Sequence, residues 1–146
     1  MSSLTGTSTE FDNAVRAAID AAQNSPDEAV RFAIHYVPVY VQARPTHDMA
    51  VAGGCPSCTY LGLWAQSWPG YTARDLGIQQ ENWHGVIFMF EEGIRRQGVP
   101  LSIQAQQTLF HEIDHALQRD HVLEHLKVAK AQYAAQVRSG CGYCGR

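Results

Sequence analysis

The chain has 146 residues, the length of one ordinary domain, and its 45% hydrophobic and 17% charged residues are typical of a soluble globular protein. Its net charge of −3 provides no attraction for nucleic acid or an anionic membrane surface, so neither is expected as a partner. The sequence has no apolar run near the ~20 residues of a membrane helix and no basic-then-apolar leader, which together favour a cytoplasmic protein.

Two amphipathic helices are expected first. Residues 9–23 repeat apolar side chains at helical spacing, and Thr9 stands where a capping residue is needed. Ser25-Pro26-Asp27-Glu28 places a Ser cap, a first-turn proline and an acid three residues after the cap, as at the start of a second helix. That helix is expected to end near Phe32.

Three later segments have the composition of strands. Residues 34–42 alternate Val with other side chains, and Pro38 within them favours an edge strand because proline cannot donate a ladder hydrogen bond. Residues 43–54 are expected to form a loop. The other two strands are expected at residues 59–64 and at residues 85–90, the latter a continuous apolar run and hence the most buried strand.

Residues 102–118 are expected to form a helix with Ser102 as its cap, and residues 122–138 a final helix. On a helical wheel of residues 102–118, one side is apolar: Ala105, Leu109, Phe110, Ile113, Ala116 and Leu117. The other side is polar: Gln104, Gln107, Thr108, His111, Glu112, His115 and Gln118. This division predicts one face packed on a core and the opposite face lining a polar cleft.

The polar face of this helix carries the sequence His-Glu-Ile-Asp-His. His111 and His115 are four residues apart, about 40° from one another around a helix, so both imidazoles can reach one ion. Glu112 lies roughly 100° from His111, where it can reach a water molecule on that ion. His121 can return a third nitrogen, and three protein ligands with one open position are typical of a catalytic zinc.

Four cysteines form two Cys-x-x-Cys pairs, Cys55 with Cys58 and Cys141 with Cys144. In a cytosolic protein such pairs indicate a metal or redox site more often than structural disulfides. We expect one structural zinc held by all four thiolates, which gives two zinc ions per chain in total. Disulfides among the pairs and a zinc shared between two chains are the alternatives.

The sequence resembles the minimal zincin-like metallopeptidases, a family of small bacterial HExxH metalloproteases. The resemblance runs from about Phe11 to His121 and rests on FDNAVRAAID, VPVYVQARP, YLGLW, VIFMF and TLFHEIDHALQRDH. It implies an α+β fold, in which a small mixed sheet packs against helices that include the HExxH helix. The expected organisation is a disordered N-terminus over residues 1–8 and one domain over residues 9–146 that ends in the Cys-x-x-Cys tail.

In that family the two helical ligands correspond to His111 and His115, the general base to Glu112, and the third ligand to His121. Gln118 stands where the family places a turn glycine, and a residue with a side chain disfavours that turn. If the turn has another shape, Asp120 or Glu124 is the alternative third ligand. The resemblance implies a zinc metallopeptidase that hydrolyses peptide bonds of a peptide or protein substrate, through a metal-activated water with Glu112 as general base.

Two other functions remain open. The first is a non-catalytic binding or regulatory module that zinc stabilises. The second is a hydrolase similar to peptide deformylase, which shares the HExDH string and takes a cysteine as third ligand, here matched loosely by Cys55 in Gly54-Cys55-Pro56-Ser57. The sequence predicts no oligomeric state.

Overall fold

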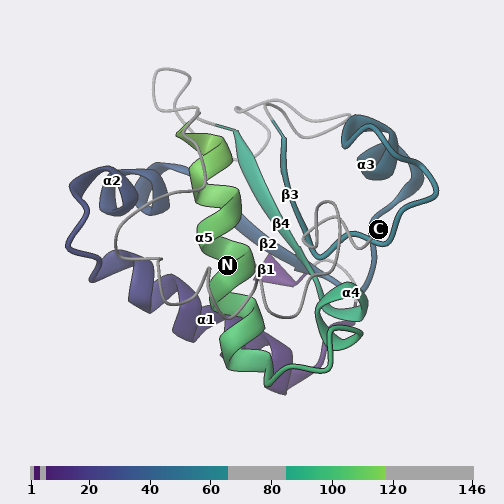
Figure 1. Ribbon diagram of the computed structural model, residues 1–146, viewed down its shortest axis with the longest axis horizontal. Coiled ribbons are helices and arrows are strands. Elements are labelled where there is room, and N and C mark those ends of the chain that lie inside the picture. The colour runs from purple at the N-terminus through teal and green to yellow at the C-terminus, as the bar shows by residue number, and fades with distance from the viewer. Residues whose placement is uncertain (1, 4–5, 66–84, 118–146) are drawn as a thin grey trace.

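The computed structural model describes residues 2–3, 6–65 and 85–117, and the nine elements in these residues form a sheet with helices on both sides. One side carries α1 (Thr9–Gln23), α2 (Glu28–Tyr36) and α5 (Leu101–Ala116), as Figure 1 shows. The other side carries α3 (His47–Ala52), and α4 (Glu91–Arg95) directly follows the central strand. None of the described helices has the length and apolar composition to cross a membrane.

The sheet has four strands in the order β1 (Ser2–Ser3), β2 (Val39–Gln42), β4 (Val86–Phe90) and β3 (Gly62–Ala65). The first three run parallel, and β3 pairs antiparallel with β4, with Leu63 opposite Phe88. A mixed sheet with packed helices confirms the α+β class.

Strand β4 is buried on both faces, as its continuous apolar sequence predicts. Ile87 and Met89 point into the core beneath α1, α2 and α5. Val86, Phe88 and Phe90 point into a second core with Met49 and Ala50 of α3 and Tyr60, Leu63 and Ala65. The alternation of side chains along one strand therefore joins the two cores.

Both N-terminal helices form where their periodicity predicts, but their caps differ. Helix α1 spans residues 9–23 as expected, and Ser8 rather than Thr9 caps it, accepting a hydrogen bond from Phe11 N at 3.1 Å. Helix α2 is capped by Asp27 rather than Ser25 and extends to Tyr36. The Ser25 hydroxyl lies before the helix, where it accepts a hydrogen bond from the N–H of Asp27.

The strand expected over residues 34–42 begins only at Val39, because residues 34–36 belong to the last turn of α2. Pro38 stands just before β2, and its carbonyl accepts a hydrogen bond from Ile87 N at 2.9 Å. This bond needs no donor from proline, so β2 can lie between β1 and β4, and the edge-strand prediction is wrong.

Two further expectations change. Within residues 43–54, expected as a loop, Thr46 caps helix α3, which places Met49 and Ala50 in the second core. Helix α5 begins at Leu101, and its cap is Pro100 with no side-chain hydrogen bond, so Ser102 is not the cap. The helix expected over residues 122–138 lies outside the described residues.

Within the segment 1–8, which was expected to be disordered, residues 2–3 and 6–8 belong to the described part of the chain. Residues 2–3 form β1, and Ser8 donates its N–H and its hydroxyl to the Glu91 carboxylate at 2.8 and 2.6 Å. Arg95 Nε donates to the same carboxylate at 2.6 Å. Glu91, at the junction of β4 and α4, therefore holds the start of α1.

This environment shifts the pKa of Glu91. Burial alone would raise it, but the hydrogen bonds from Ser8 and Arg95 and the guanidinium charge together lower the pKa below the ordinary value of 4.5. Because the folded pKa is depressed, ionised Glu91 stabilises the fold fully above its unfolded pKa. This contribution is lost as pH falls through the folded pKa.

Glu91→Gln should lower the free energy of unfolding by about 1–3 kcal/mol at pH 7, because hydrogen bonds to a buried charge are lost. Urea titrations at several pH values would measure this. The difference from wild type should shrink below pH 4.5, and Glu92→Gln, whose side chain is 46% exposed beside Arg44, is the matched control with a small effect. Equal losses in the two variants would contradict the role assigned to Glu91.

Candidate functional site

Helix α5 brings the three residues of the His-Glu-x-x-His motif to one cavity of about 260 Å³. The opposite wall comes from strand β3 and the segment before it. The residues that line the cavity are Gly53, Tyr60, Gly62, Leu63, Trp64, His111, Glu112 and His115. Of the polar face that was expected to line a cleft, the part that carries the motif lines this cavity.

His111 and His115 lie next to one another on the α5 wall of the cavity. Their Nε2 atoms are 3.1 Å apart, and their ring planes are nearly perpendicular at 83°. Two nitrogens bound to one tetrahedral zinc at about 2.0–2.1 Å lie about 3.3 Å apart, so this pair fits two corners of a zinc site. His111 is only 9% exposed, whereas His115 is exposed, so His115 is the more accessible of the two to solvent.

Glu112 is only 3% exposed and lies against strand β3 at Gly62. A Cβ atom at Gly62 would lie 3.1 Å from Glu112 Cγ and 2.7 Å from Thr108 Cγ2, closer than side chains normally approach. The absence of a side chain at Gly62 thus lets α5 approach the strand and places the carboxylate in the cavity. Glycine within an apolar strand is a sequence signal for such an approach, but it does not say what approaches.

The polar face of α5 is more buried than a helix beside an open cleft would be. Gln104, Gln107 and Thr108 are all at most 3% exposed, and Gln104 Nε2 donates to Thr108 Oγ1 at 3.2 Å. Asp114, one position before His115, is fully buried as well. Among the described residues of this face, only His115 is exposed.

The remaining predicted ligands lie outside the described residues. These are His121, its alternatives Asp120 and Glu124, and the second cysteine pair, Cys141 and Cys144. Among residues 2–3, 6–65 and 85–117, no group of three or more His, Cys, Asp or Glu side chains is arranged to hold a metal. The structure thus places two of the three expected zinc ligands, and the third stays a prediction.

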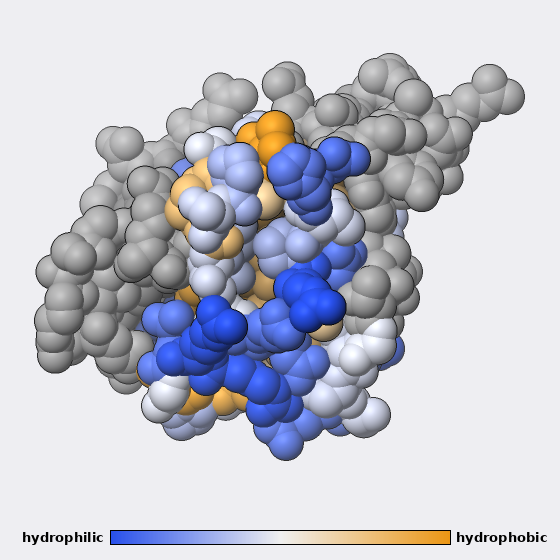
Figure 2. Space-filling model, turned by 90° about the vertical axis from the view of Figure 1, so that its right-hand side faces the viewer, coloured by the Kyte–Doolittle hydropathy of each residue, from blue (hydrophilic) through white to orange (hydrophobic). Residues whose placement is uncertain are grey.

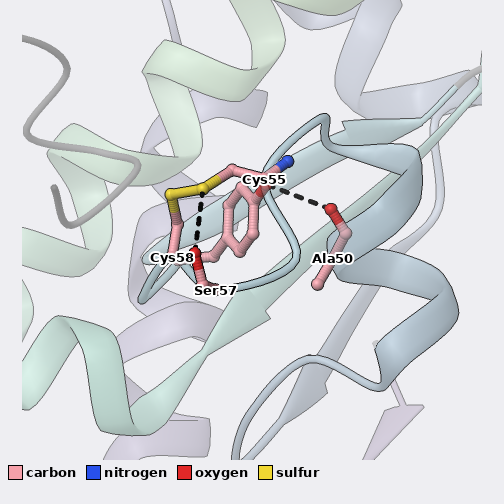
Figure 3. The surroundings of a disulfide bond; sticks show 5 residues. Ala50, Cys55, Ser57 and Cys58 are labelled. Atoms are coloured by element: carbon pink, nitrogen blue, oxygen red, sulfur yellow. Dashed lines mark hydrogen bonds between the residues drawn. A yellow bond between two sulfur atoms is a disulfide. The ribbon is translucent and has the colours of Figure 1, made fainter.

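Cys55 and Cys58 are joined by a disulfide, the form expected as an alternative to zinc (Figure 3). While this bond is intact the pair offers no thiolates, so the predicted four-cysteine zinc requires its reduction. The bond also removes the thiol that a deformylase-like third ligand would need. Cys55 is not among the described residues that line the His111 cavity.

Tyr60 connects the disulfide to the cavity. Its hydroxyl accepts a hydrogen bond from Cys55 N at 2.9 Å and donates to the Ala50 carbonyl at 3.2 Å. The ring lies so close to Gly53 that a Cβ atom there would be 2.7 Å from the hydroxyl oxygen. Gly53 was not expected at the site, because its contact with Tyr60 depends on how the 53–60 segment folds back.

Gly62→Ala should lower the free energy of unfolding by about 1–3 kcal/mol, because the new methyl group overlaps Thr108 and crowds Glu112. Denaturant unfolding would measure the loss. Thr108→Ser removes the methyl group at the closest contact, so the double variant should recover part of the stability in a double-mutant cycle. Gly6→Ala, with open space around it, is the control, and additive losses at Gly62 and Thr108 would contradict the predicted overlap.

Comparison with protein-family models, curated proteins and solved structures finds no match to this chain. The functional inference therefore depends on the geometry of the cavity and on the chemistry of the residues that line it.

Proposed function

We propose that this protein is a zinc-dependent peptidase with Glu112 as its general base. The observation that carries the proposal is the 260 Å³ cavity that is lined both by a zinc-compatible histidine pair and by a buried carboxylate next to strand β3. The sheet and the α5 helix agree in class with the minimal zincin-like metallopeptidases. We propose that the protein also has the zincin-like fold of that family.

His111 and His115 would hold the zinc ion, with His121 as the proposed third ligand. A zinc ion so held would lower the pKa of a water molecule and polarise the carbonyl of the substrate. The proposed role of the two histidines is to be neutral nitrogen donors at a fixed separation. Helix α5 supplies this separation because residues four apart lie one above the other.

Glu112 would accept the proton of the attacking water and pass it to the leaving amine. Its carboxylate is next to His111 in sequence and shares the same cavity, with little contact with bulk water at 3% exposure.

Strand β3 offers a place for an extended substrate. In the described part of the sheet β3 is an edge strand, with β4 as its neighbour on one side, and its residues 62–64 line the cavity. A peptide added along such an edge would run past the histidine pair, with main-chain hydrogen bonds to the strand. Strand β4 lies between β2 and β3, so it offers no open edge to a peptide in this sheet.

Glu112→Gln should keep zinc and lower kcat/KM for a peptide library or a denatured protein by about 10²–10⁴-fold, the usual contribution of a general base. Cleavage would be followed by mass spectrometry, with Glu28→Gln, an exposed acid of α2, as the control. Equal cleavage by wild type and Glu112→Gln would contradict the peptidase proposal. Zinc binding without cleavage in wild type would support the non-catalytic zinc module instead.

Zinc analysis of the same proteins tests the histidine site separately. We expect one zinc per chain with the Cys55–Cys58 disulfide intact, and a second only after reduction if the four cysteines form a site. His111→Ala and His115→Ala should each remove the first zinc, measured by atomic absorption after dialysis. A zinc content that these substitutions leave unchanged would show that the histidine pair does not bind the metal.

A further inference from the structure

A second cavity, of about 230 Å³, lies beside the disulfide and is separate from the histidine pair. Cys58 forms part of its wall, together with Arg44, His47, Glu92 and Arg96. Figure 2 shows the side of the molecule that carries α3 and α4, where strongly hydrophilic residues gather over its lower half. The Cys58 side of the disulfide therefore borders a hollow that is lined by charged as well as apolar residues and can hold a small molecule.

The charges of this cavity favour an anion. Arg44 and Arg96 provide two positive charges against the single carboxylate of Glu92. Arg44 lies 3.5 Å from Glu92 with its side chain 75% exposed, and Arg96 donates to Thr59 Oγ1, an uncharged partner. An exposed pair of this kind is weak, so both guanidinium groups can reorient toward a carboxylate.

The disulfide has the surroundings of a reactive bond. Cys55 and Cys58 are partly exposed, and the Pro56-Ser57 turn between them is exposed. The Ser57 hydroxyl oxygen lies 3.9 Å from Cys55 Sγ, so it can donate a hydrogen bond to a thiolate that forms there. Such a bond stabilises Cys55 as the leaving group when the disulfide is attacked at Cys58.

From these features we propose that Cys55–Cys58 is a thiol–disulfide exchange site whose reductant is a small anionic thiol bound in the cavity beside Cys58. The thiolate of the reductant attacks Cys58 Sγ, a mixed disulfide forms, and the bond to Cys55 breaks. Cys55 leaves as a thiolate and takes a proton from solvent. A second thiolate attacks the reductant's sulfur, so Cys58 leaves with the second pair of bonding electrons and takes a proton. In total, two thiols of the reductant have become one disulfide, and the Cys55–Cys58 disulfide has become two thiols.

This site is independent of the proposed peptidase activity, and reduction kinetics test it directly. In a full-length Cys141→Ser/Cys144→Ser background, the rate of reduction would be followed by alkylation and mass spectrometry with glutathione and with neutral 2-mercaptoethanol. We expect Arg44→Gln/Arg96→Gln to lower the glutathione-to-mercaptoethanol rate ratio roughly three- to tenfold. Arg16→Gln, an exposed arginine on α1, should leave the ratio unchanged.

Ser57→Ala tests the leaving group. It should slow reduction by both thiols to the same extent, roughly two- to fivefold, because its hydrogen bond acts on Cys55 and not on the reductant. An unchanged rate ratio in the double arginine variant would overturn the anionic reductant. Two results would overturn the exchange site itself: free Cys55 and Cys58 thiols in the air-oxidised protein, or a disulfide that neither glutathione nor 2-mercaptoethanol reduces.

Discussion

Helix α5 is packed on two sides at once, and the position of the candidate site depends on this double packing. Leu109 and Ile113 lie fully buried in the core shared with α1 and α2. On the other side, Thr108 and Glu112 lie against strand β3 at Gly62. A helix held from both sides cannot rotate without losing either the core packing on one side or the close contact with Gly62 on the other. Packing therefore sets the direction of the His111 and Glu112 side chains.

Burial of the polar side of α5 has a chemical consequence. Gln104 and Thr108 bond one another within the helix, and Glu112 extends from the same side into the cavity. Side chains held in this way lose less freedom when a ligand binds, because their rotamers are already restricted. The arrangement suits the proposed hydrolytic role, where a base must stay in place relative to a metal and a substrate.

Tyr60 lines both cavities, so the proposed hydrolytic and redox sites share a wall. Its hydroxyl holds the backbone of Cys55 and the last residues of α3, while its neighbour Leu61 lies in the core beneath α5. The disulfide loop and the histidine cavity are therefore parts of one packed unit. The two sites are close in space although more than 50 residues separate Cys58 from His111 along the chain.

The sequence by itself determined those features that depend on short-range periodicity. These are helices α1 and α5, the doubly buried strand β4 and the histidine pair with Glu112, because the spacing of side chains along one regular element decides each of them.

Tertiary structure decided the boundary between α2 and β2, the formation of α3, and the central place of β2 despite Pro38. Each of these depends on hydrogen bonds or contacts with distant segments, such as the bond from Ile87 N to the Pro38 carbonyl. The same holds for the cavity wall at Gly53, Tyr60 and Gly62, since a glycine permits close approach and only the packed chain shows which residue fills the space.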